Sequence, residues 1–371
     1  MPTTRFDHLM IVLLVSLLCF LHPDTFYAQS NEFIQEAQEH IEQATVLESV
    51  WQGPSTGPLA SSGKLIVYIA ADIFNDGVLT VSNGVQEAAT VVGWDVMILD
   101  GLGTVEGRSS AFRRALHIMP DGIILGGFNA TEQAEYLEEA ARQGVPVVGW
   151  HAAAFPGALT TPPVFTNITT DPLEVATIAA ALAIVESNGT ANVVIFTDSN
   201  YEIALAKSRQ IEATLRKCPT CQVLSVEDVA LSETPRVMRE VVQDLSTEYG
   251  EAWTYSIGIN DLYYDFGFDI LDKSLLPRNI SAGDGSYNAY KRIAEGEHQF
   301  ATVPEPLIMQ GWQIIDELNR ALAGESPSGY VAPVHVIYTK NIVQERIMQT
   351  GIFDPQNTYR EQYRQIWLGQ N

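Results

Sequence analysis

The chain has few basic residues for its length: 21 Lys and Arg stand against 45 Asp and Glu in 371 residues, a formal net charge of −24. No stretch concentrates the basic residues, so nucleic acid is not an expected partner. The acidic excess favours solubility and does not specify a fold. The length is sufficient for two domains, each with its own apolar core.

Long apolar runs are absent apart from Leu9–Leu21 at the N-terminus. Arg5 precedes this run, and polar residues and Ala28 follow it, which is the pattern of a secretory signal. The run is shorter than the roughly 20 residues that span a bilayer, so we predict cleavage after Ala28 in preference to an uncleaved membrane anchor. A lipid anchor on Cys19 is disfavoured because the bulky Leu18 precedes it.

Cysteine is also scarce: the chain has three, and the predicted mature chain keeps only Cys218 and Cys221. A pair separated by two residues can be a redox centre, half of a zinc site or a disulfide. No second Cys or His pair completes a zinc site. A redox pair usually begins a helix, whereas this pair follows the predicted helix Tyr201–Lys217. In an exported protein we therefore predict a local structural disulfide and no metal site.

The motifs of several enzyme classes are missing. The chain has no Walker motif, no Gly-x-Ser-x-Gly elbow and no His-Glu-x-x-His sequence. Residues 101–107 resemble a dinucleotide-binding fingerprint, but the third glycine is displaced by one position and the segment follows the second predicted strand. We interpret this segment as a loop, and we expect neither a cofactor nor an enzymatic activity.

Leu65–Ala71 is an apolar run rich in strand-forming residues. It predicts a strand buried on both faces, as in a parallel sheet. A polar and aromatic loop follows from Asp72, and a helical pattern then runs from Gly77 to Gly93. Asp76 is the expected N-cap of this helix and Gly93 its stop. Hydrogen-bonding groups thus follow the carboxyl end of a strand, which is where open α/β sheets bind ligands.

Similar strand–loop–helix units repeat along the chain. The later predicted strands are Asp95–Leu99, Gly122–Leu125, Val145–Trp150, Val164–Ile168, Asn192–Phe196, Gln222–Val226, Trp253–Ile259, Asn279–Ala282 and Gln299–Val303. The helices between and after them are Ser109–His117, Thr131–Gln143, Leu173–Glu186, Tyr201–Lys217, Pro235–Tyr249, Asp261–Leu271, Tyr287–Glu295 and Leu307–Ala323. This alternation predicts parallel sheets, and about ten strands are too many for one compact sheet, so two sheets are expected.

An amphipathic helix at residues 31–48 precedes these units, followed by a linker rich in Gly, Pro and Ser at residues 53–64. The apolar face of the helix could bind a partner, but we expect it to pack on its own domain. That face consists of Phe33, Ala37, Ile41 and Ala44.

Several short motifs occur in an order typical of one family. Asp121–Leu125 reads Asp-Gly-Ile-Ile-Leu, and Gly144–Val148 reads Gly-Val-Pro-Val-Val. Further along, Asn260 stands before an aspartate at the end of a predicted strand. Asp284 then follows a glycine, and an Ala-Thr-Val strand end leads to Glu305. With these motifs the chain resembles a type I periplasmic binding protein of the ribose/galactose-binding kind, the solute receptor of an ABC importer.

The resemblance implies the fold and the domain boundaries. The fold is α/β, with two doubly wound parallel-sheet lobes joined by a hinge that the chain crosses three times, near Asn167, Glu305 and Pro333. The implied divisions are a signal peptide at 1–28, a helix and linker at 29–63, one lobe at 64–166 plus 306–331, a second lobe at 167–305 plus 332–338, and a C-terminal extension at 339–371.

The resemblance also implies a ligand site between the lobes. Carboxylates and amides would bind hydroxyl groups, and aromatic rings would contact the C–H faces of a saturated polar ligand. The implied site residues are Asp72, Phe74, Asn75, Trp150, His151, Lys207, Asn260, Asp284 and Glu305. Trp150 could instead belong to the core. Asp261 is expected to cap its helix, and Tyr263, Tyr264 and Phe266 are expected in the core or at the rim.

His151 and Ala152 stand where sugar-binding relatives commonly carry Asp-Arg, so the bidentate contact of an arginine with hydroxyl groups is absent. A small neutral sugar or polyol is expected, and a cation on Trp150 is the variant. The resemblance implies a periplasmic monomer that delivers its ligand to an ABC-transporter permease. The alternatives are a periplasmic sensor that presents its closed form to a signalling receptor, and a secreted enzyme that uses His151 but lacks an ordered nucleophile motif.

Overall fold

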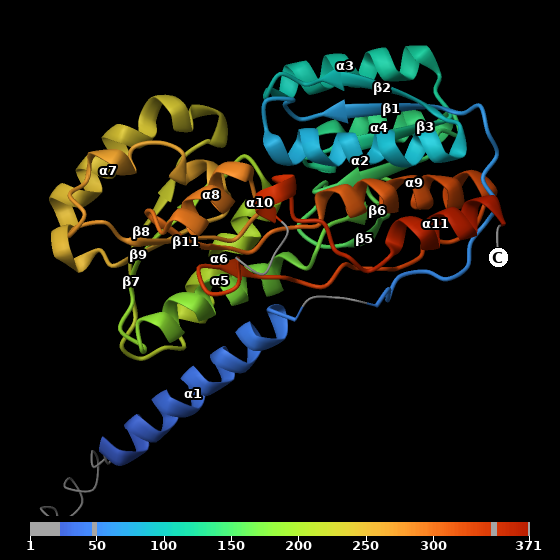
Figure 1. Cartoon of the computed structure of the whole chain (residues 1–371). Coiled ribbons are helices and arrows are strands. Elements are labelled where there is room, and N and C mark those ends of the chain that lie inside the picture. The colour runs from blue at the N-terminus through green and yellow to red at the C-terminus, as the bar shows by residue number, and fades with distance from the viewer. Residues whose placement is uncertain (1–22, 47–49, 343–346, 370–371) are drawn as a thin grey trace, which may run out of the picture.

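The computed structural model describes residues 23–46, 50–342 and 347–369. It has two lobes, each with a six-stranded sheet between helices, as Figure 1 shows. The predicted two-sheet α/β fold is confirmed. The predicted signal falls largely on residues 1–22, which lie outside the described residues. Among the helices of the described ranges, none combines the length and the apolar character needed to cross a bilayer.

The first lobe is built on a sheet with the strand order β2-β1-β3-β4-β6-β5. Its strand β1 lies parallel to and between β2 and β3, and the side chains of residues 66–69 are fully buried. The short β5 pairs antiparallel with β6 at the edge. The strands are β1 (Leu65–Ala70), β2 (Asp95–Asp100), β3 (Gly122–Gly126), β4 (Val147–Trp150), β5 (Gly157–Leu159) and β6 (Val164–Ile168). The helices of this lobe are α2 (Asp76–Val92), α3 (Val105–Ile118), η1 (Ala130–Gln133), α4 (Ala134–Arg142), α9 (Leu307–Ala323) and α11 (Tyr359–Leu368).

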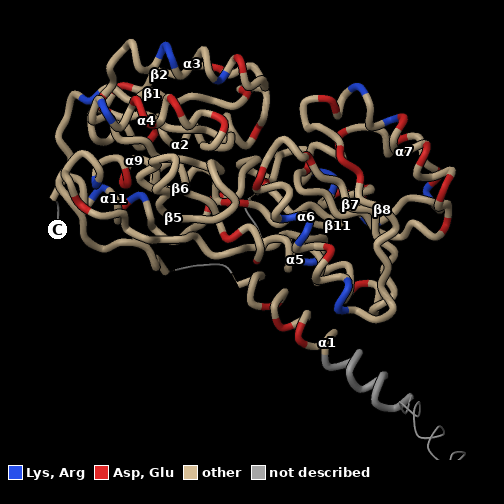
Figure 2. The backbone as a smooth tube through the Cα atoms, turned by 180° about the vertical axis from the view of Figure 1, so that it is seen from behind, with Lys and Arg blue, Asp and Glu red and all other residues tan. Residues whose placement is uncertain are grey.

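The second lobe repeats this plan with the strand order β12-β11-β10-β9-β7-β8. All neighbours are parallel except β12, which pairs antiparallel with β11. The strands are β7 (Asn192–Thr197), β8 (Gln222–Asp228), β9 (Tyr255–Gly258), β10 (Arg278–Ser281), β11 (Gln299–Thr302) and β12 (Ile337–Tyr338). The helices are α1 (Pro23–Ala44), α5 (Pro172–Glu186), α6 (Glu202–Leu215), η2 (Leu231–Glu233), α7 (Thr234–Tyr249), η3 (Gly250–Ala252), η4 (Asp261–Tyr264), η5 (Phe268–Ile270), α8 (Tyr287–Glu295) and α10 (Ile347–Thr350). Acidic positions are spread over both lobes, and the basic ones are scattered among them (Figure 2).

Helix α2 begins one residue earlier than predicted. Asn75, not Asp76, is its N-cap: the backbone of Asn75 is extended, and its side-chain oxygen accepts hydrogen bonds from the backbone N–H groups of Gly77 and Val78. Asp76 is already helical, so its carboxylate cannot take this role. The predicted stop is confirmed, because Gly93 ends the helix in the left-handed conformation at φ 69°.

The predicted helix Asp261–Leu271 is wrong. Two short 3₁₀ turns, η4 and η5, take its place. Gly267 separates them at φ 88°, and a Cβ on this residue would lie 2.7 Å from the carbonyl oxygen of Met238. Tyr263 and Tyr264 belong to the core, as predicted, and their hydroxyls donate to backbone carbonyls. The tightly packed turn therefore replaces a regular helix.

The N-terminal segment contacts both lobes. Helix α1 packs on α5 of the second lobe and buries Ala37, Ile41 and Ala44 there, on the face that the sequence predicts. Farther along, Trp51 packs between aromatic side chains of the first lobe, and Arg320 of α9 donates to the carbonyl oxygen of Thr56. The chain thus passes from the second lobe to the first between Ala44 and Trp51.

The C-terminal extension also contacts both lobes. Ile347 and Phe353 share a small apolar cluster with Tyr290 of α8 in the second lobe. Helix α11 then packs on α9 of the first lobe, where Trp367 stacks on Trp312 with ring centroids 5.4 Å apart. The indole N–H of Trp367 donates to Asp316 Oδ1 of α9 at 2.8 Å. The extension therefore covers α9 and forms part of the core of the first lobe.

The chain therefore crosses between the lobes more often than predicted. The three expected passages lie between β6 and α5, between β11 and α9, and between α9 and β12. The terminal segments add two further passages, one between Ala44 and Trp51 and one between Phe353 and α11. Each of these two segments packs apolar side chains on one lobe before the passage and on the other lobe after it.

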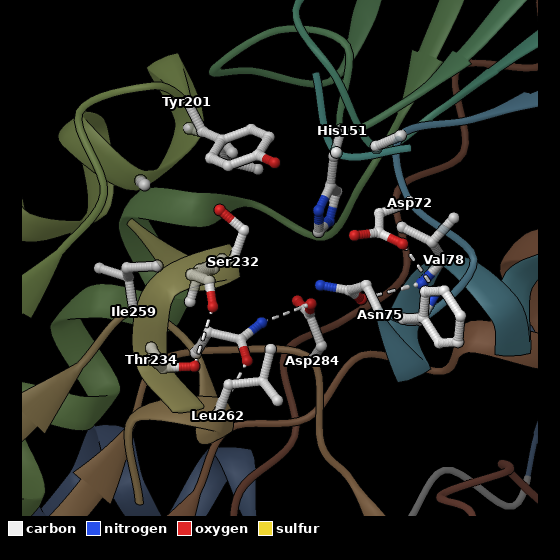
Figure 3. Close-up of a pocket in the computed structure, with 18 of the residues that line it drawn as sticks. Asp72, Asn75, Val78, His151, Tyr201, Ser232, Thr234, Ile259, Leu262 and Asp284 are labelled. Atoms are coloured by element: carbon white, nitrogen blue, oxygen red, sulfur yellow. Dashed lines mark hydrogen bonds between the residues drawn. The ribbon is translucent and has the colours of Figure 1, made fainter. Parts of the chain in front are cut away.

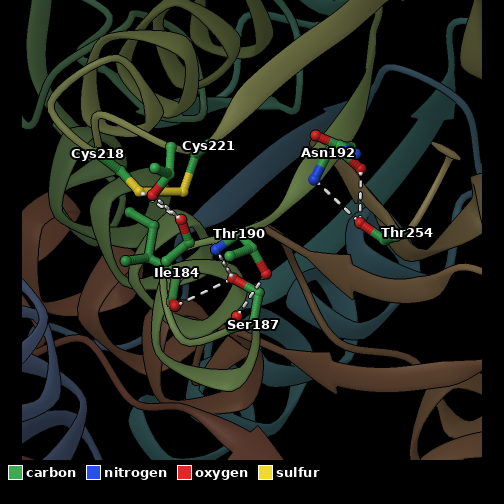
Figure 4. Close-up of a disulfide and its surroundings, with 9 residues drawn as sticks. Ile184, Ser187, Thr190, Asn192, Cys218, Cys221 and Thr254 are labelled. Atoms are coloured by element: carbon green, nitrogen blue, oxygen red, sulfur yellow. Dashed lines mark hydrogen bonds between the residues drawn. A yellow bond between two sulfur atoms is a disulfide. The ribbon is translucent and has the colours of Figure 1, made fainter.

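The predicted disulfide is present. Cys218 and Cys221 are bonded, with their Cα atoms 5.4 Å apart, between the C-terminus of α6 and the start of β8 (Figure 4). The hydroxyl of Thr220, between them, donates to the carbonyl oxygen of Gly189. The disulfide thus lies in the short loop between α6 and β8, and this loop is hydrogen-bonded to the turn after α5.

Expressed in an oxidising compartment, the chain beginning at Gln29 is expected to show no free thiol after denaturation. Replacing both cysteines by serine (Cys218→Ser with Cys221→Ser) should lower the free energy of unfolding by about 2 kcal/mol, because the unfolded chain loses the closure of a four-residue loop. Urea denaturation of the variant and of oxidised and reduced wild-type protein measures this. Two reactive thiols in the oxidised protein would contradict the assignment.

Candidate functional site

A cavity of about 440 Å³ lies between the two lobes. It opens where β1 and β4 of the first lobe and β9 and β10 of the second end, the position at which parallel sheets offer loop side chains. Figure 3 shows side chains from both lobes pointing toward it. Eight of the nine predicted site residues line the cavity, and these are Asp72, Phe74, Asn75, Trp150, His151, Lys207, Asn260 and Asp284.

The ninth predicted residue, Glu305, lies beneath the cavity on the passage between β11 and α9, with its side chain fully buried. Its carboxylate accepts hydrogen bonds from His151 Nε2 at 2.9 Å, from Gln310 Nε2 at 2.6 Å and from the backbone N–H of Thr170 at 3.1 Å. The ammonium of Lys207 lies 3.9 Å away. These groups come from both lobes, so Glu305 joins them at the hinge.

The environment of Glu305 keeps it ionised. Burial by itself raises the pKa of this carboxyl, but the charge and hydrogen bond of His151, together with Lys207 and Gln310, lower the pKa to about 2. At neutral pH the carboxylate therefore supplies a fixed negative charge to the buried ammonium of Lys207.

His151 follows β4 with a left-handed backbone at φ 53° and is 8% exposed. Its imidazole stacks on the indole of Trp150, with ring centroids 4.0 Å apart and an angle of 13° between the planes. Trp150 is 1% exposed, and its N–H donates to Gln310 Oε1 at 2.8 Å. Trp150 therefore belongs to the core and also reaches the cavity wall, so both predicted positions apply to it. The imidazole of His151 covers one face of its ring.

Asn260 and Asp284 form a pair on the second lobe. The side-chain N–H of Asn260 donates to Asp284 Oδ2 at 2.9 Å, and its oxygen accepts from the backbone N–H of Leu262 at 3.0 Å. The predicted cap role of Asp261 is wrong, since Asn260 caps the turn η4. Asp261 is instead buried behind the pair and accepts from the backbone N–H of Gly285. Burial raises its pKa to about 7, although a hydrogen bond from a glutamine opposes the shift.

The loop after β1 supplies three predicted residues. Asp72 Oδ1 accepts from the backbone N–H of Phe74 at 2.9 Å, which orders the loop. Asn75 uses its side-chain oxygen to cap α2, while no described residue accepts a hydrogen bond from its side-chain nitrogen. Phe74 stands at the rim and is 86% exposed. The loop thus presents a carboxylate and an amide to the cavity, with an aromatic ring at the entrance.

Lys207 comes from α6, and its side chain is 3% exposed. Within the described chain its ammonium makes no hydrogen bond; its contact is the ion pair with Glu305. His151, Asp284 and Glu305 have donor atoms within 4.8 Å of one another, a spacing that could hold a cation. The nearby ammonium opposes a second positive charge at this place.

Sequence reasoning missed several residues of the site. Tyr201 lines the cavity, and burial, with nearby Asp198, raises its pKa to about 12, so its hydroxyl stays protonated and can donate. Its position after the first strand of the second lobe matches that of the Asp72 loop in the first, a signal that could have identified it. Gln310, five residues after Glu305, carried no such signal.

The overall structure is similar to those of several solved proteins. A sugar ABC transporter protein from Yersinia enterocolitica subsp. enterocolitica 8081 superposes with a TM-score of 0.69 at 16% identity, over 83% of this chain and 98% of that one. The arabinose ABC transporter binding protein from Shewanella sp. ANA-3 gives 0.65 at 16% identity, over 76% and 93%. A solute-binding protein from Bacillus halodurans C-125 with bound myo-inositol gives 0.66 at 13%, over 76% and 97%. At these identities the likeness shows a shared fold.

A comparison with curated protein sequences finds no match. The family model described as periplasmic binding protein domain matches residues 65–326. This range includes both sheets apart from β12, and all nine predicted site residues. Because the match spans well over half of the chain, this protein belongs to the periplasmic binding protein domain family.

Proposed function

We propose that this protein captures a small sugar or polyol between its two lobes in the periplasm and delivers it, as a monomer, to the permease of an ABC transporter. The observation that carries the proposal is the cavity between the lobes, which buried polar groups of both lobes line. Structural neighbours support the ligand class, since their descriptions name bound arabinofuranose, tagatopyranose, allitol and myo-inositol. Family membership favours binding over the enzymatic alternative.

In this proposal the ligand contacts come from both lobes. The first lobe offers the carboxylate of Asp72 and the amide of Asn75, and the second offers Asn260 and Asp284. Lys207 is held at the cavity floor by its charge pair with the hinge residue beneath it. Phe74 and the rings of Trp150 and His151 supply the aromatic surfaces of the site.

The proposed movement is a hinge closure of the lobes at residues 64–166 plus 306–331 and 167–305 plus 332–338. A ligand that contacts both lobes makes more contacts in the closed state, so it shifts the population toward closure. Turning a mostly open ensemble into a mostly closed one takes about 5.5 kcal/mol of differential affinity, which several two-sided hydrogen bonds can supply. The closed form is then the one that a permease recognises. The sensor alternative would use the same closed form and has no observation of its own in its favour.

A thermal-shift screen against sugars, polyols and amines is expected to identify the ligand, because a molecule that binds only the native state raises the melting temperature. At saturation with the best sugar or polyol, small-angle scattering should give a smaller radius of gyration than for the free protein. A matched non-binding sugar at the same concentration is the control. Tight binding without compaction would contradict the closure mechanism, and a screen in which only amines bind would contradict the ligand class.

A further inference from the structure

The side chain of Asn129 forms hydrogen bonds with the opposite lobe. This residue follows β3 of the first lobe and directly precedes η1, a position at which an asparagine ordinarily caps its own helix. Among the described residues, none of its own lobe bonds to this side chain. Its Nδ2 donates to the carbonyl oxygen of Asn200 at 3.0 Å, and its Oδ1 accepts from the backbone N–H of Glu202 at 3.1 Å. Both partners belong to the second lobe, so the amide, which is 7% exposed, is enclosed between the lobes.

These bonds cap the N-terminus of α6. The first N–H groups of a helix have no partner within the helix, and the side chain of Tyr201, the residue before α6, accepts from none of them. Glu202 is the first residue of α6, so Asn129 supplies the missing acceptor from across the lobe boundary. The hydroxyl of Thr131 adds a third bond between the lobes by donating to Glu202 Oε1 at 3.2 Å.

The inter-lobe cap lies away from the hinge. In the first sheet, β4 separates β3 from β6, the strand that leads into one passage between the lobes. In the second sheet, β9 and β10 separate β7, which precedes α6, from β11, which leads into another passage. Opening the lobes would therefore separate Asn129 from Asn200 and Glu202. The bonds of Glu305, by contrast, lie on the passage between β11 and α9.

The capped segment carries two residues of the cavity. Tyr201 lies between the two bonded positions in the sequence, and Figure 3 shows its ring beside the cavity. Lys207 follows farther along α6. Asn129 itself does not line the cavity. Its side chain therefore holds the α6 wall of the cavity against the first lobe without reaching into the space that a ligand would occupy.

We propose that Asn129 is a positioning residue for lobe closure: it caps α6 when the lobes are together and loses this contact when they open, so it stabilises the closed state through protein atoms alone. This inference rests on the proposed hinge closure and adds a determinant that the ligand does not supply. A few hydrogen bonds change an equilibrium constant by about tenfold. A full shift from open to closed requires a factor of about ten thousand, so the cap supplies part of it and the ligand still decides closure.

The mature chain without any added sugar provides the first test, after exhaustive dialysis. Asn129→Ala removes both bonds of the cap and should show a larger radius of gyration than wild type by small-angle scattering. Asn83→Ala, at an exposed position of α2, is the matched control and should leave the radius unchanged. Thr131→Val removes the third bond and repeats the test if Asn129→Ala does not fold, as judged by circular dichroism. A radius equal to that of wild type in the folded variant overturns the inference.

Binding provides the second test, by calorimetry with L-arabinose, D-tagatose, allitol and myo-inositol as probes. Each probe that binds wild type should bind Asn129→Ala about tenfold more weakly and by the same factor, because apparent affinity falls with the population of the binding-competent state. A residue that touches the ligand would give a different factor for each probe. A residue that only supports the fold would lower the melting temperature and leave the affinity of the folded protein unchanged. Either result overturns the positioning role.

The two tests separate this inference from the proposed function. If none of the probes binds wild type, the result counts against the proposed ligand class alone, since the comparison of the free proteins still decides the role of Asn129. If probes bind and compact wild type while Asn129→Ala has the same free radius and the same affinities, the proposed function stands and the inter-lobe cap has no part in closure.

Discussion

Replacing Glu305 by alanine is expected to lower the free energy of unfolding by about 3–5 kcal/mol at pH 7, since it leaves a buried charge without its partner. The ammonium of Lys207 and the N–H groups of His151, Gln310 and Thr170 would all lose the acceptor or charge that they share. Urea denaturation followed by circular dichroism measures the change. Glu138→Ala, on an exposed position of α4, is the matched control and should change stability by less than about 0.5 kcal/mol.

The same carboxylate predicts an acid dependence with a definite sign. Its pKa is lowered from 4.5 to about 2 in the folded protein, so the stability it contributes is present above pH 4.5 and is lost as the pH falls toward 2. The shift corresponds to about 3 kcal/mol at 1.36 kcal/mol per pKa unit. Glu305→Gln, which does not titrate, should lose correspondingly less stability over this range. Identical acid profiles for wild type and the glutamine variant would contradict the assigned role of Glu305.

Replacing Asp284 by alanine is expected to weaken binding of the ligand found in the screen by tenfold to a hundredfold. The carboxylate lines the cavity and accepts from Asn260, so its loss removes a charged acceptor for a ligand hydroxyl and leaves the asparagine amide unpaired. Such a contact contributes about 1.5–3 kcal/mol, and each 1.4 kcal/mol is a factor of ten in affinity. Isothermal titration calorimetry measures it.

Asp272→Ala is the control for Asp284→Ala, since this aspartate is exposed on the same lobe and away from the cavity. Thermal melts of both variants establish that they are folded. Unchanged affinity in a folded Asp284→Ala protein would mean that the ligand binds outside the proposed cleft.

The fold could be predicted because its signals are local. The apolar run of β1 and the glycine that ends α2 depend on neighbours in the sequence, and both were identified. The errors occur where several local choices compete. Asn75 and Asp76 are both good caps, and the backbone conformation at residue 75 decided between them. The segment after Asn260 has a helical composition, but the packing of Tyr263 and the conformation of Gly267 override it.

The sequence predicted which residues come together at the cavity, but it did not predict the hydrogen bonds among them. The resemblance placed His151 in the ligand site and Glu305 at the hinge, yet their hydrogen bond joins positions 154 residues apart and follows no periodicity. Gln310 bonds to both Glu305 and Trp150 from within a helix whose sequence reads as ordinary core packing. Contacts of this kind form only when the two lobes are assembled. The sequence therefore identified the site residues at strand ends but not the residues, such as Gln310, that orient them.

The covering of α9 by the last helix has a consequence for the order in which the protein can fold during synthesis. The core of the first lobe contains Ile66 of β1 and Trp367 of α11. The ribosome makes these two side chains some three hundred residues apart, whereas the strands β7–β11 of the second lobe are made consecutively. Domains generally form their cores as their residues become available. We therefore expect the second lobe to fold before the first, whose core stays incomplete until the segment of α11 has been made.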